Sequence, residues 1–333
     1  MVRDRGSDQA GSDDGDHAHC FEWGGCGVHS LQSSCCGAFN SSVTSSYANR
    51  FLAYALLCNS LFYFIQENLS LSSATPSTSP LSVQHVINAL VSARQQGGVA
   101  SVEKFDGALT TAEQAYEVQS AVAKILGWFG TDFPHYWKSG GPNRDATLTH
   151  APLPSAGVWN SPAEAGSFIF HRRGIEAEVA LRMCKAVDHT MAIELDEASA
   201  SSVIDAMAVS LEIVDSRWQE CMAAPALMRL ADLQCHGALI VGEWQPWHDR
   251  DWAQQVCRVQ IGEQPIVERR GTHPLGTPTW GLAAWLRHAT REGAVVPAGT
   301  VVTTGTWVGV LDARPGDLVV ASFDGIGSAQ VQL

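Results

Sequence analysis

The sequence predicts an α+β or mostly-β domain built on a mixed sheet. Three observations support this: apolar residues at helical spacing in 81–130, short β-rich segments after residue 165, and helical patterns between those segments. The 333 residues, 45% of them hydrophobic, suffice for one large domain or two small ones. The net charge of −13, without a basic stretch interleaved with aromatics, predicts no nucleic-acid partner.

Residues 1–80 differ in composition from the rest of the chain. The first fifty are rich in Ser, Gly, Asp and Cys and show no sustained period, which predicts disorder. Residues 51–65, "FLAYALLCNSLFYFI", are apolar but shorter than the roughly twenty residues that span a bilayer. They fit an amphipathic or buried helix or a weak signal-anchor, and residues 70–80 are typical of a linker.

The same segment has a second interpretation. Met1 is the only methionine before Met183, so a non-Met start near Leu81 or Val83 would make residues 1–80 translated upstream sequence. Under both interpretations residues 81–333 form the catalytic domain, and 1–80 are either a disordered or a non-native extension.

Two helices are predicted at the start of this domain. In residues 82–97, apolar side chains recur at helical spacing, with Ser82 as the N-cap and Gly97 after the last turn. Residues 109–128 begin with a Thr-x-x-Glu or Thr-x-x-Gln capping box and continue as an amphipathic helix.

Strands predominate after residue 165. The β-rich segments are 167–172, 175–183, 238–244, 255–262 and 317–333. Helical patterns are predicted at 196–208 and 278–293. No internal repeat or Gly-rich phosphate loop is visible.

The nine cysteines are unevenly distributed. Five lie before residue 80, and no C-x-x-C pair supports a zinc site. The other four, Cys184, Cys221, Cys235 and Cys257, are expected to be small buried side chains in a reducing compartment.

Acidic residues occur within two apolar segments. In "GIEAEVAL" (174–181), Glu176 and Glu178 lie on one face of a strand, where they should repel each other and resist burial. In "VSLEIVDSRW" (209–218), Glu212 and Asp215 are similarly placed. Converging carboxylates favour a hard divalent ion, Mg²⁺ or Mn²⁺. The alternative is an exposed strand edge with Glu178 or Asp215 paired to an arginine.

Seven segments occur in an order that resembles a known group. They are "LTTAEQAYEVQ", "WKSGG", "GIEAEVAL", "LEIVDSRW", "HGALIVGEW", "THPLGTPTWGLAAWL" and "TTGTWVGVLDARPGDLVVASFDGIGSAQV". This order is similar to the 2-keto-4-pentenoate hydratase and 4-oxalocrotonate decarboxylase group of the fumarylacetoacetate hydrolase superfamily, over about residues 81–333. The resemblance implies a mixed β-roll core of the fumarylacetoacetate hydrolase C-terminal type with a helical N-terminal portion.

The resemblance also implies a site. Glu176, Glu178 and Glu212 would bind Mg²⁺ or Mn²⁺, with Asp215 as a second-shell or alternative ligand. Lys138 in "WKSGG" matches a lysine that the hydratases keep at the active site. Burial near a metal should lower its pKa, so that it could exchange protons near neutral pH.

One position departs from the hydratase pattern. The hydratases carry a Pro-Asp-aromatic-Gly stretch whose Asp assists proton transfer, whereas Ser155 stands there in "PSAGVW". A serine cannot act as a carboxylate base, so Ser155 does not supply the group that assists proton transfer in the hydratases. If the alignment of this loop slips, Asp145 is the nearest carboxylate.

The implied activity is a hydratase that adds water to a short unsaturated 2-keto acid of the 2-hydroxypenta-2,4-dienoate type, in the degradation of aromatic compounds. The alternatives are an oxalocrotonate-type decarboxylase, a C–C hydrolase and a non-catalytic partner subunit. In all the enzymatic cases a 2-keto acid chelates the metal, which stabilises an enolate.

Further expectations concern the pocket and the assembly. Thr304 and Thr306 in "TTGTW" could bind the substrate carboxylate, or be buried threonines of a strand turn. His273 is a candidate acid or base, or a structural histidine.

Relatives form dimers and larger rings, so the resemblance implies a homo-oligomer, or pairing with a decarboxylase or hydratase partner. The predicted location is cytoplasmic.

Overall fold

The computed structural model describes residues 82–333. The predictions for residues 1–80, including the apolar segment 51–65, lie outside the described part of the chain. Within the part that is described, no helix has both the length and the apolar character needed to cross a membrane.

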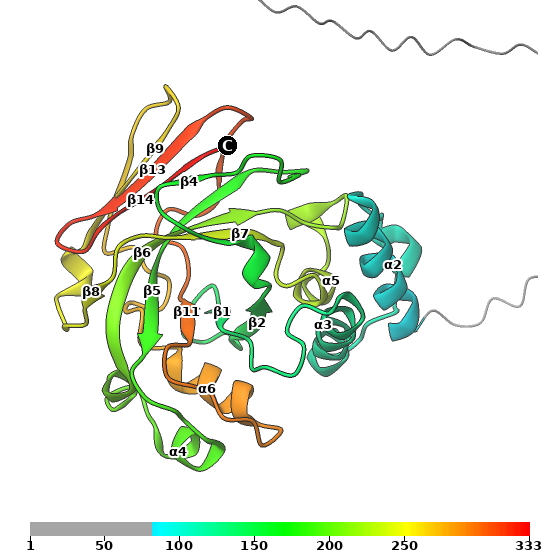
Figure 1. Ribbon diagram of the computed structural model, residues 1–333, viewed down its shortest axis with the longest axis horizontal. Coiled ribbons are helices and arrows are strands. Elements are labelled where there is room, and N and C mark those ends of the chain that lie inside the picture. Colours follow the sequence, from blue (N-terminus) through cyan, green and yellow to red (C-terminus); the bar gives the residue numbers. More distant parts are fainter. Residues whose placement is uncertain (1–81) are drawn as a thin grey trace, which may run out of the picture. The chain divides into compact units, whose positions relative to one another are not determined.

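The helical N-terminal portion is confirmed (Figure 1). Helix α2 (Val83–Gln96) begins after Ser82 and ends at Gly97, whose φ of 63° is left-handed. Helix α3 (Ala112–Leu126) uses the second of the two possible capping boxes, formed by Thr111 and Gln114. The remaining helices are α4 (His189–Glu194), α5 (Ala226–Ala231) and α6 (Leu282–Thr290), with 3₁₀ turns η1 (Val102–Phe105), η2 (Ser155–Gly157), η3 (Ala200–Val203), η4 (Cys221–Ala223) and η5 (Trp252–Gln254).

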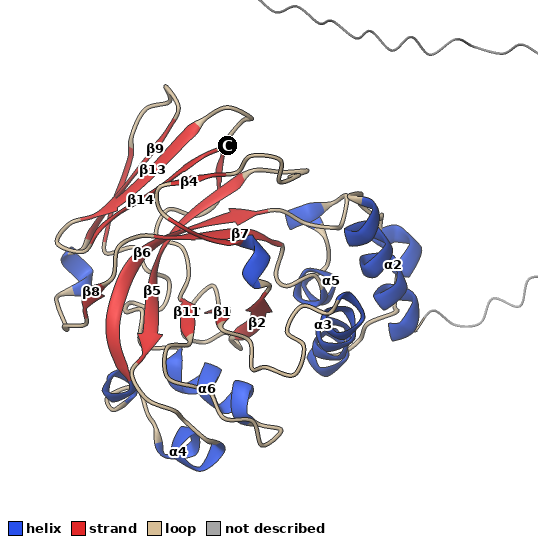
Figure 2. Cartoon of the chain, viewed as in Figure 1, coloured by secondary structure: helices blue, strands red, loops and turns tan. Residues whose placement is uncertain are grey.

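The larger sheet has nine strands and is mixed (Figure 2). Its main path runs β2-β1-β11-β5-β6-β7-β3, with β12 paired to β5 and β8 paired to β6. The β1–β11 and β3–β7 pairs are parallel and the other pairs are antiparallel. The strands are β1 (Tyr136–Gly140), β2 (Thr149–Leu153), β3 (Val158–Asn160), β5 (Gly174–Met183), β6 (Ile204–Val214), β7 (His236–Val241), β8 (Gln245–Pro246), β11 (Val301–Thr303) and β12 (Leu311–Asp312).

A second sheet of five strands runs β10-β9-β13-β14-β4. Its strands are β4 (Ala163–Glu164), β9 (Val256–Ile261), β10 (Val267–Arg270), β13 (Leu318–Phe323) and β14 (Gly327–Gln332). One apolar core joins the sheets, since it contains Val179 and Val209 from the first and Val259 and Ala321 from the second. The α+β fold with a mixed-sheet core is therefore confirmed.

Two strands, β5 and β6, position the acidic residues. Their antiparallel register places Glu176 opposite Glu212 and Glu178 opposite Ser210. Because alternate residues leave opposite faces of a strand, the glutamates share one face while Ile175 and Ala177 enter the core on the other.

Two segments differ from prediction. Residues 167–172 are not a strand, because the amides of His171 and Arg172 donate to Asp215 Oδ1, at 3.1 and 2.7 Å, instead of to a neighbouring strand. The helix predicted over 196–208 is wrong beyond the short turn η3, since β6 begins at Ile204. Strand β6 is buried on both faces from Ala206 onward, and such a strand lacks the period-two pattern.

Candidate active site

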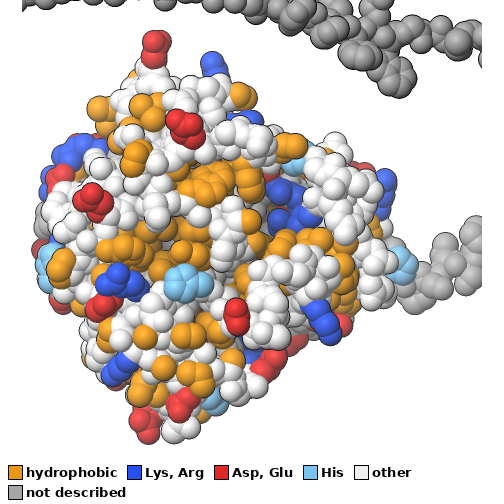
Figure 3. Space-filling model, viewed as in Figure 1, with side chains coloured by type: hydrophobic (Ala, Val, Ile, Leu, Met, Phe, Trp, Pro, Cys, Tyr) orange, Lys and Arg blue, Asp and Glu red, His pale blue; other side chains and the backbone are white. Residues whose placement is uncertain are grey.

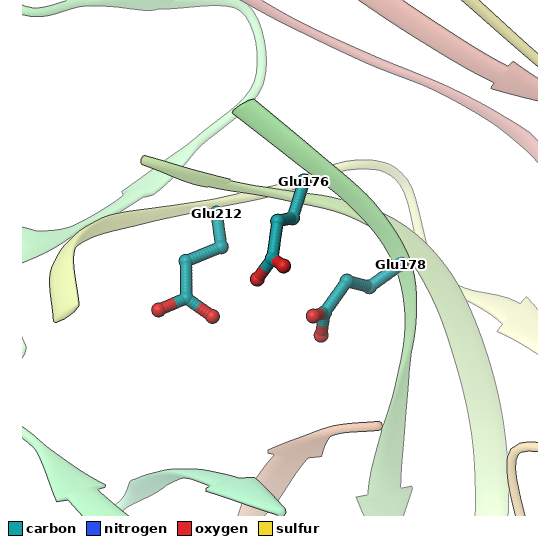
Figure 4. Close-up of side chains that lie close together, drawn as sticks. All are labelled: Glu176, Glu178 and Glu212. Carbon is teal, nitrogen blue, oxygen red and sulfur yellow. The ribbon is translucent and has the colours of Figure 1, made fainter. Parts of the chain in front are cut away.

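Three glutamates converge on the face of β5 and β6 that lies opposite the apolar core (Figure 4). One carboxylate oxygen from each of Glu176, Glu178 and Glu212 lies within 4.8 Å of the others. Glu178 and Glu212 are buried, and Glu176 is half-buried. Three acids this close need a compensating positive charge.

The pKa values of the three carboxyl groups are shifted in different directions. Burial raises the pKa of Glu176 to about 8 and that of Glu178 to about 7, and the neighbouring carboxylates add to both shifts. Burial also acts on Glu212, but Lys138 and His236 outweigh it and hold the pKa of Glu212 below its usual value. Glu212 is thus the carboxylate most firmly kept in its charged form.

Lys138, on β1, supplies one positive charge. Its Nζ donates to Glu212 Oε1 at 2.5 Å and to the backbone oxygen of Gln234 at 3.3 Å. Burial disfavours the ammonium, but the three glutamates outweigh burial, so the pKa of Lys138 is raised. The lowered pKa expected from the sequence applies to a lysine beside a bound metal, and for that state it stays a prediction.

His236, at the start of β7, is the second partner of Glu212. Its Nδ1 lies 3.1 Å from Glu212 Oε1, and burial lowers its pKa. The next residue, Gly237, is required by packing, since a Cβ there would lie 2.7 Å from the Ile213 oxygen. Glycine thus lets β7 approach β6 closely enough for this contact.

The remaining oxygen, Glu212 Oε2, is buried and has no hydrogen-bond partner among the described residues. An orphaned buried carboxylate oxygen is costly, and a cation would satisfy it. The donor set consists of oxygens only, which suits hard divalent ions. The residues present therefore fit a Mg²⁺ or Mn²⁺ ion.

Glu176 and Glu178 border a cavity of about 770 Å³. Glu176 and Glu178 are the only acidic residues along its wall within residues 82–333. Its wall includes Lys138, Thr149, Arg229, Gln234, Arg269, Thr303 and Thr306. A small molecule in this cavity would contact Lys138 and two of the three carboxylates.

Glu178 is held by the last residue of β11 and by the turn that follows it. The Thr303 hydroxyl and the Gly305 amide both donate to Glu178 Oε2, the amide at 3.1 Å. Gly305 has φ 109°, a conformation that L side chains rarely adopt. Glycine in "TTGTW" therefore aims a backbone donor at this carboxylate.

The two threonines predicted to bind substrate are placed differently. The Thr304 hydroxyl donates to the Val179 oxygen at 2.7 Å and does not border the cavity, so its predicted contact with substrate is corrected. The cause is strand alternation, which turns Thr303 rather than Thr304 toward Glu178. Thr306 lies on the cavity wall and stays a predicted substrate contact.

Asp215 does not join the carboxylate cluster. It pairs with Arg217 and accepts the amides of His171 and Arg172. It follows β6 at the position whose side chain leaves the opposite face from Val214. Asp215 therefore fixes a loop and is not one of the converging carboxylates, so its prediction as an alternative ligand is corrected.

The other predicted positions do not line the cavity. Ser155 and Asp145 are exposed and do not border the cavity. His273 is buried, with Nε2 on the Thr304 oxygen at 3.0 Å and Nδ1 accepting the Leu275 amide at 3.2 Å. Burial lowers its pKa to about 4, which is typical of a structural histidine.

Sequence reasoning missed His236, Thr303 and the two cavity arginines. His236 opens the segment "HGALIVGEW", but its contact with Glu212 crosses between strands and leaves no spacing signal. Arg229 and Arg269 come from α5 and β10, which meet only in the folded chain.

The face in Figure 3 carries acidic and basic side chains intermixed with hydrophobic ones, and its described part has no continuous basic stripe. A mixed-sheet α+β domain with three converging carboxylates beside a cavity defines the class of protein, one able to hold a hard cation next to a small molecule. The chain belongs to the fumarylacetoacetate (FAA) hydrolase family: the C-terminal family model matches residues 149–333, more than half of the chain. The predicted superfamily is therefore confirmed.

Solved structures share the fold. One is 4-oxalocrotonate decarboxylase from Pseudomonas putida G7 complexed with magnesium and adipate, with a TM-score of 0.64 and 18% identity, covering 75% of this chain and 96% of that one. The same enzyme complexed with calcium and acetate gives 0.63 and 19%, with the same coverage. Comparison with curated protein sequences gave no significant match.

Proposed function

We propose that this protein is a divalent-metal-dependent lyase that acts on a short unsaturated 2-keto acid, with Mg²⁺ or Mn²⁺ bound by Glu176, Glu178 and Glu212. The observation that carries the proposal is the convergence of three carboxylates, one with an orphaned buried oxygen, beside a cavity that contains a lysine. The decarboxylase of similar fold binds magnesium or calcium, which supports a hard cation here.

A bound cation would supply Lewis-acid stabilisation of negative charge on the keto and carboxylate oxygens of the substrate. Lys138 is placed to move the proton, because its ammonium lies between Glu212 and the cavity. His236 and the Gln234 carbonyl orient Glu212 and Lys138, respectively. Thr306 on the cavity wall is a proposed contact for the substrate carboxylate.

The predicted reaction is hydration of a 2-hydroxypenta-2,4-dienoate-type substrate. Decarboxylation is the second candidate, because Arg229 and Arg269 border the same cavity and neither forms an ion pair with an acid in residues 82–333. Arg229 is half-buried and Arg269 is exposed, so both guanidinium groups border the cavity from partly solvated positions. Two unpaired guanidinium groups there would suit a second carboxylate at the far end of the substrate.

The test of metal binding uses the full chain stripped of metal. Titration of Mg²⁺ and Mn²⁺ should give saturable binding in the wild type and no measurable binding in Glu176→Ala. Glu263→Ala, an exposed residue away from the cavity, is the matched control and should bind as the wild type does. Absence of metal binding in the wild type would refute the proposed site.

The test of the reaction compares two substrates under saturating metal. Loss of the dienol absorbance of 2-hydroxypenta-2,4-dienoate, without release of carbon dioxide, supports the hydratase. Faster turnover of 2-oxohex-3-enedioate, with release of carbon dioxide and a higher KM in Arg269→Gln, supports the decarboxylase. Metal binding without turnover of either substrate would favour a non-catalytic partner subunit.

Size-exclusion chromatography tests the predicted homo-oligomer.

A further inference from the structure

A second cavity lies where the N-terminal helices meet the start of β7, and its volume is about 480 Å³. Its wall is formed by α2 and the turn after it, the end of α3, η2, residues 167–171, Arg217 and the first residues of β7. None of these wall residues borders the cavity beside Glu176 and Glu178, which is the active-site cavity. The second cavity is therefore a separate candidate site.

The wall of the second cavity carries basic side chains. It includes Arg94, His171, Arg217 and His236 and, within residues 82–333, no aspartate or glutamate. Arg94 is half-buried, and Arg217 is only 8% exposed. Guanidinium groups that border a cavity and are fixed by their surroundings are suited to bind an anion.

The two arginines have unused hydrogen-bond donors. Arg94 Nη2 donates to Asp232 Oδ1 at 2.7 Å, and Arg217 Nη2 donates to Asp215 Oδ2. No other guanidinium nitrogen of either arginine forms a hydrogen bond within residues 82–333, and Arg217 Nε is buried without a partner there. Since a guanidinium has five N–H donors, both arginines can donate to a further acceptor.

Buried aspartates fix the two arginines relative to each other. Asp232 accepts the Arg94 guanidinium on Oδ1 and the backbone amide of Arg217 on Oδ2, the latter at 2.6 Å. Asp215 and Asp232 are both buried, and neither borders the second cavity. The two ion pairs cancel in charge, so the cavity offers directed donors without an excess of positive charge. Such a site favours a singly charged carboxylate over a doubly charged phosphate.

The rest of the wall is mostly apolar. The apolar residues that border the second cavity include Ala93, Leu126, Trp128, Pro154, Phe168 and Ile169. The Trp128 ring lies against one of the arginines, with Arg94 Cζ 4.9 Å from the ring centroid. Phe168 and Ile169 are 38% and 64% exposed, so a ligand with an apolar body would remove hydrophobic surface from water.

We propose that the second cavity binds a small aromatic carboxylate, with the carboxylate on Arg94 and Arg217 and the ring against Trp128 and Phe168. One residue links this site to the carboxylate cluster: His236 borders the second cavity, and its Nδ1 lies 3.1 Å from Glu212 Oε1. The proposal rests on this wall and not on the reaction at the active site.

The test measures the binding of benzoate to the full chain by ligand-observed NMR titration, without metal and with saturating Mg²⁺. Saturable binding is expected under both conditions, because none of the proposed metal ligands borders the second cavity. Benzamide, which lacks the charge, and acetate, which lacks the ring, should each bind at least roughly tenfold more weakly. Inorganic phosphate should also bind more weakly than benzoate.

A blocking variant locates the site. Gly98 borders the second cavity, its φ is not left-handed, and a Cβ there would have no heavy atom within 4 Å. Gly98→Leu should therefore fold, fill part of the cavity and weaken benzoate binding at least roughly tenfold. Ser120→Leu adds the same side chain at an exposed position on α3 that does not border the second cavity. This matched control should bind benzoate as the wild type does.

A charge variant tests the recognition of the carboxylate. Arg94→Gln should weaken benzoate binding at least roughly tenfold and benzamide binding little, a difference that a purely structural effect would not produce. Arg269→Gln, on the wall of the active-site cavity, should leave benzoate binding unchanged. Thermal unfolding shows whether each variant is folded, and Gly98→Leu decides the test if Arg94→Gln is not.

Four results would overturn the proposal. The first is benzoate binding that requires Mg²⁺, or that is lost in Arg269→Gln and kept in Gly98→Leu, because benzoate would then occupy the active-site cavity. The second is equal affinity for benzoate and benzamide, and the third is tighter binding of phosphate than of benzoate. The fourth is the absence of saturable benzoate binding by the wild type.

Discussion

The two faces of strands β5 and β6 are made from alternate residues of the same short segments, yet they have opposite effects on the stability of the fold. One face carries Ile175, Val179 and Leu181, all fully buried in the core shared by the two sheets. The other carries Glu176, Glu178 and, across the pair, Glu212. Burial of a Leu or Ile side chain contributes roughly 1.5–3 kcal/mol to folding, whereas buried carboxyls oppose it. The apolar face thus stabilises the strands that hold the acidic face in place.

The largest expected effect comes from breaking the apolar face. Leu181→Ala should lower the free energy of unfolding by about 2–5 kcal/mol, since it leaves a cavity in a closely packed core. Urea denaturation followed by far-UV circular dichroism measures this change. Leu318→Ala, the same truncation at an exposed position on β13, should cost far less.

The comparison also predicts that the two faces are separable. The Leu181→Ala protein, measured while still folded, should bind Mg²⁺ with nearly the wild-type affinity, because the carboxylates leave the opposite face. A large loss of affinity in this variant would show that the acidic face depends on core packing more closely than the register suggests.

Much of the fold was predictable because it follows from local patterns. The caps at Ser82 and Gly97 set the limits of α2, and the apolar run of 175–183 predicted β5. The errors arose where tertiary contacts override local pattern. Asp215 draws the amides of residues 171 and 172 away from a strand, and β6 is buried on both faces, so its sequence does not alternate.

The candidate site was predictable only in part. Strand alternation placed Glu176 and Glu178 on one face, but the segment "TTGTW" did not reveal that Thr303 rather than Thr304 would contact Glu178. His236 contacts Glu212 across two strands, and the pairing of β6 with β7 cannot be read from spacing along the chain. Contacts between distant segments are fixed by topology, and single-residue patterns do not encode them.

A smaller effect is expected from neutralising one residue of the acidic face. Glu178→Gln keeps an oxygen that can accept from Thr303 and Gly305, so the fold should be retained. Removal of a charged ligand should weaken Mg²⁺ binding by roughly 100-fold, a free energy of about 2.7 kcal/mol. Isothermal titration calorimetry measures the affinity.

Thermal unfolding provides the control for that variant. At Mg²⁺ near 100 times the Kd, the wild type should gain about 2.7 kcal/mol of stability, and Glu178→Gln should lose most of this gain. Without metal, the variant should be at least as stable as the wild type, because one buried acid is gone. A metal-free variant much less stable than the wild type would show that Glu178 has a structural role instead.

The smallest expected effect is the change in Mg²⁺ affinity per pH unit for each proton that the acidic face releases. Burial raises the pKa of Glu176 to about 8 and that of Glu178 to about 7, so both carboxyls take up protons on folding. The stability that this protonation contributes to the metal-free fold is lost as the pH rises through about 7 and 8. Mg²⁺ must displace these protons, so its apparent affinity should rise with pH over the same range, by up to about tenfold per unit for each proton released. Calorimetric titrations between about pH 6 and 9, repeated in buffers of different ionisation enthalpy, count those protons. Glu178→Gln should release fewer protons than the wild type. An affinity that does not change over this pH range would mean that Lys138 already keeps all three carboxylates charged. The acidic face would then lower the free energy of unfolding by less than its burial implies.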